Sequence, residues 1–171
     1  MTLPNIITLF RIALIPLFVY FLIFYNPVQG KFIAAGIFAF LALSDAIDGM
    51  LARKFGQVSA LGKFLDPLAD KFLVVVALLG LTELRIVSSI PVMIIVAREF
   101  AVMGFRVHAA SKNLNVAASQ MAKLKTVLQM IAVLMLILYI PYGALVLWLA
   151  VIVSVISGIE YFWNLRGAIY G

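Results

Sequence analysis

Four aspartates at short, regular intervals form the part of the sequence best suited to chemistry. They are Asp45, Asp48, Asp66 and Asp70, four of the seven acidic residues in a chain of 171 residues. On a helix, Asp45 and Asp48 would lie about 60° apart around the axis and about 4.5 Å apart along it. Asp66 and Asp70 would lie about 40° apart and about 6 Å along a helix of their own. Each pair therefore shares a helix face, and two such faces brought together would form an oxygen-rich site suited to two magnesium or manganese ions.

Small residues and one arginine accompany these carboxylates. Gly49 and Ala52 lie about one turn apart, so a helix or a ligand can approach the backbone there. Arg53 follows Gly49 by four residues and shares its face, where a guanidinium can hold a phosphate opposite the metal ions. Gly62 precedes Asp66 by four residues and begins a second stripe. An aspartate taken singly can merely pair with a cation, and small residues can merely pack helices, but the joint pattern argues against packing alone.

The composition around this stretch is that of a membrane protein. Hydrophobic residues make up 65% of the chain and charged residues 12%, with a mean hydropathy of +1.18. A soluble domain of this length does not have such a composition, and the lack of cysteine excludes disulfide and thiolate chemistry. We predict an all-α integral membrane protein forming one domain over residues 1–171. The six expected transmembrane helices, each of about 20 residues, span 4–25, 32–54, 62–83, 88–110, 119–140 and 143–166.

The distribution of basic residues predicts the orientation of this bundle. Lys31 and Arg85 mark one side. The other side carries Arg53, Lys54, Lys63, Lys112, Lys123, Lys125 and Arg166. The positive-inside rule therefore places both termini and the aspartates toward the cytoplasm, in the cell (inner) membrane. The net charge of +6 reflects these loop charges and an anionic partner, not nucleic acid.

The depth of the charged residues indicates a shared cavity. Residues 32–43 form an apolar or small run before Ser44 and Asp45, which is about 18 Å of helix against about 30 Å of hydrocarbon. Arg11 in the first span and the Arg98–Glu99 pair in the fourth are expected at similar depth. Isolated charges there would be costly, so we infer one polar cavity in the cytoplasmic half of the membrane. Such a cavity suits an enzyme that joins a lipid to a soluble molecule.

The aspartate pattern resembles the complete signature of the CDP-alcohol phosphatidyltransferases. All eight fixed positions of that signature are matched within residues 45–70, which read D-x-x-D-G-x-x-A-R, eight further residues and then G-x-x-x-D-x-x-x-D. The resemblance implies a homodimer of six-helix transmembrane subunits with a site facing the cytosol. It also implies displacement of CMP from a CDP-linked lipid or alcohol with the help of a divalent metal pair.

The same resemblance assigns a role to each matched position. The metals would be held by Asp45, Asp48, Asp66 and Asp70. Asp70 would also take the proton of the acceptor hydroxyl. The CDP group would be contacted by Asp48, Gly49, Ala52, Arg53 and Gly62.

The rest of the chain bears on the acceptor. The N-terminal segment, with Asn5, Thr8 and Arg11 as possible pocket residues, and the run from Arg98 to Thr126 resemble the phosphatidylglycerophosphate synthase branch of the family. That resemblance implies CDP-diacylglycerol and glycerol 3-phosphate as substrates. The acceptor phosphate would need a cluster of cations, for which the candidates are Arg98, Arg106, Lys123 and Lys125. Alternatively, Arg98 only neutralises Glu99, and the other three only anchor the protein at the cytoplasmic interface.

Alternative functions exist both within this family and outside it. Within the family, the acceptor could instead be serine, inositol phosphate or a second phosphatidylglycerol. An acceptor without phosphate would have less use for a deep arginine cluster. A small cation transporter with its ion site at the aspartates would need polar residues continuing across the membrane, and the sequence has none. A membrane scaffold would leave the aspartate pattern unexplained.

Overall fold

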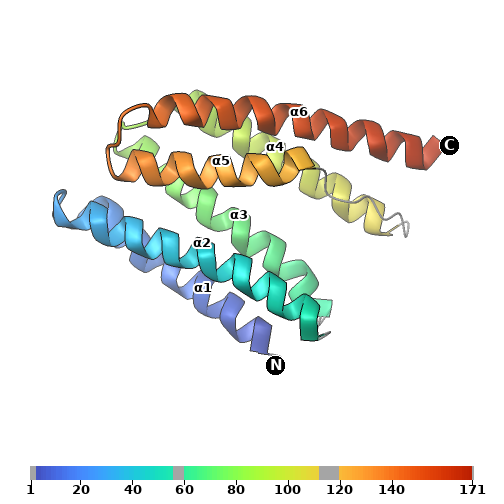
Figure 1. The fold of residues 1–171 in the computed structure, drawn as a ribbon, viewed down its shortest axis with the longest axis horizontal. Coiled ribbons are helices and arrows are strands. Elements are labelled where there is room, and N and C mark those ends of the chain that lie inside the picture. The colour runs from blue at the N-terminus through green and yellow to red at the C-terminus, as the bar shows by residue number, and fades with distance from the viewer. Residues whose placement is uncertain (1–2, 56–59, 112–119, 171) are drawn as a thin grey trace. The chain divides into compact units, whose positions relative to one another are not determined.

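The computed structural model describes the backbone of residues 3–55, 60–111 and 120–170, and the side chains of residues 10, 12–44, 71–107, 109 and 120–164. Within these ranges the fold is all-helical, without a β-strand (Figure 1). Each of the six stretches expected to be helical coincides with an α-helix, which confirms the all-α class. The elements are α1 (Leu3–Val19), the π-helical segment η1 (Tyr20–Phe24), α2 (Gln29–Phe55), α3 (Ala60–Glu83), α4 (Ser89–Ser111), α5 (Gln120–Ile137) and α6 (Gly143–Tyr170).

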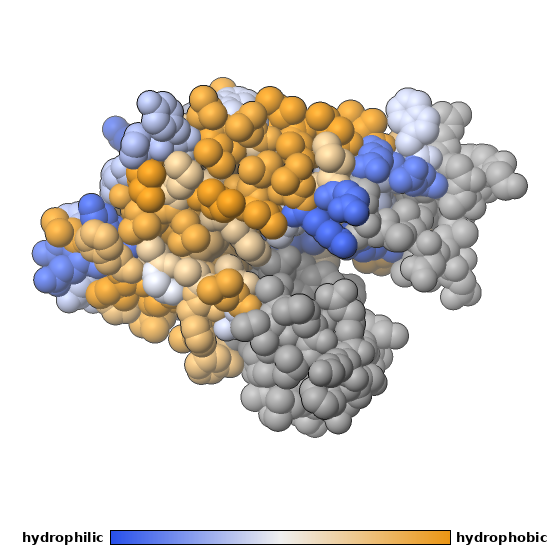
Figure 2. All heavy atoms as spheres, viewed as in Figure 1, coloured by the Kyte–Doolittle hydropathy of each residue, from blue (hydrophilic) through white to orange (hydrophobic). Residues whose placement is uncertain are grey.

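The surface of these helices is largely apolar. On the face drawn in Figure 2, apolar residues cover much of the described surface. Several large aromatic side chains are mostly exposed, such as Phe24 at 73% and Trp163 at 69%. Two stretches, Gln120–Ile137 and Gly143–Asn164, are long and apolar enough to cross a bilayer, and Ile12–Phe24 and Gln29–Ser44 are shorter apolar helices. Helices that expose so much apolar surface are expected to meet lipid instead of water.

The helices divide into two compact units. The first comprises residues 1–87 and 133–140. In it α1 packs against α2 and α3, and α2 also contacts η1 and α3. Its core is apolar: Phe18 of α1, Phe38 of α2 and Leu78 of α3 are fully buried, and the rings of Phe18 and Phe38 lie 5.9 Å apart. No buried polar residue occurs among the described side chains of this unit.

Two glycines allow the helices of the first unit to approach closely. A Cβ atom at Gly30 would lie 2.5 Å from the carbonyl oxygen of Phe21, and one at Gly80 would lie 2.8 Å from Cδ2 of Leu22. Asn26 caps the turn that leads into α2, since its Oδ1 atom accepts a hydrogen bond from the backbone N–H of Val28 at 2.9 Å. The start of α2 is therefore held tightly against η1.

The second unit comprises residues 88–132 and 141–171, and here α4 packs against α6 (Figure 1). Its apolar core includes Ile95 of α4 and Leu147 and Ala150 of α6. The same unit holds every buried polar residue among the described side chains, and these are Glu99, Lys125, Gln129, Ser154 and Ser157. Part of its core is thus polar.

Candidate functional site

The aspartate motif lies on the two helices that were expected to carry it. Asp45 and Asp48 fall within α2, and Asp66 and Asp70 fall within α3. Helical backbone at all four positions gives each pair the shared face that the spacing predicted. The contact between α2 and α3 makes these helices neighbours within the first unit. The backbone therefore meets two requirements of the predicted metal site, regular register and adjacent helices.

The side chains of the motif lie outside the described residues. This applies to the four aspartates, and also to the CDP-contact and pocket candidates Gly49, Ala52, Arg53, Gly62, Asn5, Thr8 and Arg11. The described side chains nearest in sequence mark where the apolar core of α2 ends. Leu41 is 1% exposed, and the hydroxyl of Ser44 donates a hydrogen bond to the carbonyl oxygen of Phe40 at 2.7 Å. The motif begins at the next residue.

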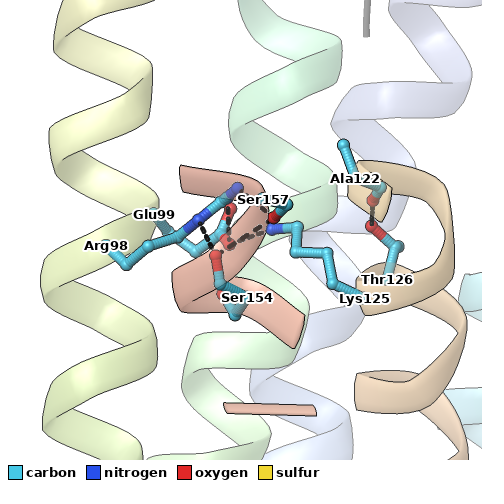
Figure 3. Close-up of polar contacts among 7 residues, drawn as sticks. All are labelled: Arg98, Glu99, Ala122, Lys125, Thr126, Ser154 and Ser157. Carbon is cyan, nitrogen blue, oxygen red and sulfur yellow. Dashed lines mark hydrogen bonds and ion pairs between the residues drawn. The ribbon is translucent and has the colours of Figure 1, made fainter. Parts of the chain in front are cut away.

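The second unit contains a polar cluster built around Arg98 of α4 (Figure 3). Its Nε atom donates to the carbonyl oxygen of Ser154 at 2.9 Å, and Nη2 donates to Oγ of Ser157 at 2.7 Å. Its Nη1 atom donates to Oε1 of Glu99 at 3.0 Å. All three guanidinium nitrogens thus have acceptors within the unit, and the side chain of Arg98 is only 10% exposed.

A glycine on α6 makes room for this arginine. A Cβ atom at Gly158 would lie 3.2 Å from Nε of Arg98 and 3.4 Å from its Cγ atom. Ser157 adds a bond within the helix, since its hydroxyl donates to the carbonyl oxygen of Ser154 at 3.0 Å. Two serines three residues apart followed by glycine therefore form a cradle for the guanidinium.

Glu99 is shared between two cations from different helices. Besides Arg98, the ammonium group of Lys125 on α5 donates to the same carboxylate oxygen, and Glu99 and Lys125 are 5% and 6% exposed. Charges buried to this extent are stable only when paired and hydrogen-bonded. The structure therefore contains the ion pair between Arg98 and Glu99 that the alternative interpretation expected. Lys125 forms a second ion pair with the same carboxylate.

The other two cations proposed for the acceptor phosphate have open surroundings. Lys123 is exposed, because on α5 it lies about 200° around the helix from Lys125. Arg106 is exposed two turns after Arg98 on α4, and its guanidinium carbon lies 5.7 Å from the centroid of the Tyr161 ring on α6. The four candidates therefore form two classes: Arg98, which is part-buried, and Lys125, which is buried, both contact Glu99, whereas Arg106 and Lys123 are exposed.

Sequence reasoning missed the α6 side of this site. The sequence prediction did not include Ser154, Ser157 and Gly158. Two serines and a glycine within one apolar candidate transmembrane helix do, however, indicate a polar contact with another helix. Gln129, one turn after Lys125 on α5, was also missed and is 3% exposed. Within the described part of the chain, neither Nε2 of Gln129 nor Oγ of Ser154 has a hydrogen-bond partner. The second unit thus has buried hydrogen-bonding capacity beyond the contacts of Arg98, Glu99 and Lys125.

Known proteins resemble the chain over nearly its whole length. It is 39% identical to the CDP-diacylglycerol–glycerol-3-phosphate 3-phosphatidyltransferase of Rickettsia bellii, with 94% of this chain and 93% of that protein covered. Proteins with the same name from Bacillus subtilis and Escherichia coli are 40% and 38% identical, covering 94% and 92% of this chain and 93% and 91% of their own lengths. A family model described as CDP-alcohol phosphatidyltransferase matches residues 1–156. The chain belongs to the CDP-alcohol phosphatidyltransferase family.

Proposed function

We propose that the protein transfers the phosphatidyl group of CDP-diacylglycerol to glycerol 3-phosphate, giving phosphatidylglycerol phosphate and CMP. The observation that carries this proposal is similarity over more than nine tenths of the chain to three bacterial enzymes whose names state this reaction. The aspartate motif on α2 and α3 supports it, because these helices carry the residues that the chemistry requires. The family is one of transferases, so neither a cation transporter nor a scaffold has support.

In this proposal a pair of divalent metal ions, magnesium or manganese, is held by Asp45, Asp48, Asp66 and Asp70. The fit rests on helical register and on donor chemistry, since carboxylate oxygens in two i, i+3 and i, i+4 pairs suit hard cations. Metal ions bound there would neutralise the pyrophosphate oxygens and the leaving phosphate. Through these metal ions, the carboxylates would hold the pyrophosphate of the donor at the ends of α2 and α3 that we propose to face the cytoplasm.

The proton and the nucleotide are assigned to residues of the same two helices. Asp70 would take the proton of the acceptor hydroxyl as its oxygen bonds to the phosphorus that carries diacylglycerol. The bond from that phosphorus to the CMP phosphate breaks, and CMP leaves with the electron pair. Arg53 would bind the CDP group beside Asp48, with Gly49, Ala52 and Gly62 leaving room for it.

The acceptor phosphate is proposed to bind to the cations of α4 and α5, with different roles for the two classes. Arg106 and Lys123 are exposed, so they would meet a phosphate arriving from water. Arg98 is part-buried and Lys125 is buried, and both contact Glu99, so they would provide positive charge at fixed positions. Asn5, Thr8 and Arg11 on α1 are proposed separately, as pocket residues of the first unit.

For the membrane arrangement, we propose six transmembrane helices, both termini and the active site on the cytoplasmic side, and a homodimer. Support for the six transmembrane helices comes from the helix lengths and the exposed apolar side chains. Support for the cytoplasmic side comes from the distribution of lysine and arginine. The homodimer is taken from the family resemblance. In this arrangement the acyl chains of the donor stay in the bilayer while its head group reaches the aspartates.

The direct test measures CMP released by the purified protein in CDP-diacylglycerol micelles, with each acceptor offered in turn. We expect rapid release with glycerol 3-phosphate and very little with glycerol, serine, inositol phosphate or phosphatidylglycerol. Equal rates with glycerol or serine would refute the assigned acceptor while leaving the transferase chemistry in place. No release with any acceptor would refute the proposed function itself.

A further inference from the structure

Arg106 and Tyr161 form a contact between α4 and α6 that joins an open cation to a fixed ring. The guanidinium carbon lies over the ring, 5.7 Å from its centroid. Arg106 is exposed, whereas Tyr161 is only 7% exposed and packs with Val102 and Ala109 in a small apolar cluster. Such packing leaves the ring little freedom to move. One partner of the contact is therefore anchored in the protein and the other reaches the surface.

A cation over an aromatic ring at this distance is attracted to the ring by the negative charge of its face. An arginine can stack by its flat face and keep its N–H donors, which lie in the plane of the guanidinium, available for a carboxylate or phosphate. Without such a contact, an exposed arginine samples many rotamers, and binding a ligand has to restrict them. A stacked Arg106 would thus be ready to bind before the ligand arrives.

The comparison with Arg98 shows why this matters for a ligand. The three nitrogens of Arg98 donate to Ser154, Ser157 and Glu99, so its orientation is set by hydrogen bonds that also use its donors. Arg106 has no carboxylate partner within the described part of the chain, and its contact with Tyr161 uses none of its N–H groups. The contact with Tyr161 therefore orients Arg106 without using its N–H donors.

We propose that Tyr161 is a positioning residue, whose ring holds the guanidinium of Arg106 with its N–H donors free to receive the phosphate of a small phosphorylated acceptor. The inference rests on the proposed function, and it adds a residue of α6 that acts through Arg106 without touching the substrate. The effect depends on the ring and not on the phenol hydroxyl.

The test compares Tyr161→Phe, which keeps the ring, with Tyr161→Met, which keeps apolar volume and fills irregular space but loses the ring. We expect Tyr161→Met to raise the Michaelis constant for glycerol 3-phosphate about 2- to 30-fold, the range that corresponds to cation–π energies. Tyr161→Phe should change it less than about twofold, and neither variant should change the Michaelis constant for CDP-diacylglycerol. The matched control is Phe162→Leu, since the ring of Phe162 pairs with Phe105 at a centroid distance of 5.5 Å.

A double-variant experiment separates positioning from a structural effect. Once Arg106 is replaced in Arg106→Ala, adding Tyr161→Met should raise the Michaelis constant for glycerol 3-phosphate no further. An equal increase in both backgrounds, or no increase in the unmodified background, would overturn the inference. If Tyr161→Met does not fold, as judged by its thermal midpoint in detergent, Tyr161→Leu takes its place with the same expectations. Failure of the proposed function is a different result, because the unmodified protein would then release no CMP with glycerol 3-phosphate.

Discussion

The two units of the molecule manage polar groups in opposite ways. Among the described side chains, the first unit buries only apolar residues, and two glycines bring its helices close together. The second unit buries a glutamate, a lysine, a glutamine and two serines, and joins α4, α5 and α6 through one carboxylate and one guanidinium. Packing holds the first unit, and a polar network helps to hold the second.

The two units also differ in which groups neutralise their charged side chains. The second unit supplies counter-charges from its own side chains, since Arg98 and Lys125 both contact Glu99. The first unit places four aspartates on two adjacent helices, and the charge balance we propose there depends on metal ions from solution. In the proposed function, the charged donor would bind to the first unit and the anionic acceptor to the second.

The largest expected effect comes from removing metal ions. Chelation should reduce CMP release to background, and added magnesium or manganese should restore it, because in our proposal the aspartates would hold the pyrophosphate through these cations. Helical content by circular dichroism should stay unchanged, since both units are held by contacts within the protein. Full activity in excess chelator would contradict the assignment of the first unit.

The next largest effect is expected for Asp70→Asn. Loss of a general base alone slows a reaction by about 10²- to 10⁴-fold, and this variant also loses a proposed metal ligand. Affinity for CDP-diacylglycerol should fall less than in Asp45→Asn, which is the comparison variant. Turnover close to that of the unmodified protein would exclude the proton-accepting role of Asp70.

Replacing Glu99 tests the network of the second unit. Glu99→Leu removes the carboxylate that pairs with Arg98 and Lys125, and breaking a buried ion pair in this way costs about 3–5 kcal/mol. We expect a large drop in the thermal midpoint in detergent. The matched control is Glu83→Leu, which removes the same charge at an exposed position at the end of α3. Equal stability of the two variants would mean that the network contributes little.

Replacing Gly30 tests the packing of the first unit with a smaller expected effect. In Gly30→Ala the new methyl group would meet the carbonyl oxygen of Phe21 at 2.5 Å, and such overpacking costs about 1–3 kcal/mol. Gly36→Ala is the control in the same helix, because a Cβ atom there would meet nothing within 4 Å. The control should be neutral or slightly stabilising. A Gly30→Ala variant as stable as Gly36→Ala would show that the close approach is unimportant.

The helices could be predicted because long apolar runs and their polar boundaries are local properties of the sequence. All six appear where expected, although α2 begins at Gln29 instead of 32, since the cap formed by Asn26 was not recognised. The π-helical geometry of η1 was also missed, because an apolar run has the same composition in an α-helix and in a π-helix. The aspartate motif was found because its members are close in sequence.

The partners of the cations could not be predicted in the same way. The acceptors of Arg98 on α6 lie 56 and 59 residues further along the chain, and Lys125 lies 26 residues from Glu99. Such pairs depend on the rotation of each helix about its axis, which an almost uniformly apolar sequence specifies weakly. The exposure of Lys123 beside the buried Lys125 is decided by the same rotation.

The most direct test of the division between the units is paired saturation kinetics on Arg53→Ala in α2 and Arg106→Ala in α4. Arg53→Ala should raise the Michaelis constant for CDP-diacylglycerol, and Arg106→Ala should raise that for glycerol 3-phosphate. Each increase should be about 10- to 150-fold, because a hydrogen bond to a charged group contributes about 1.5–3 kcal/mol. Arg53→Ala should change the Michaelis constant for glycerol 3-phosphate little, and Arg106→Ala should change that for CDP-diacylglycerol little. If both variants weaken the same substrate, or if Arg106→Ala leaves glycerol 3-phosphate saturation unchanged, the assignment of donor and acceptor to separate units is wrong.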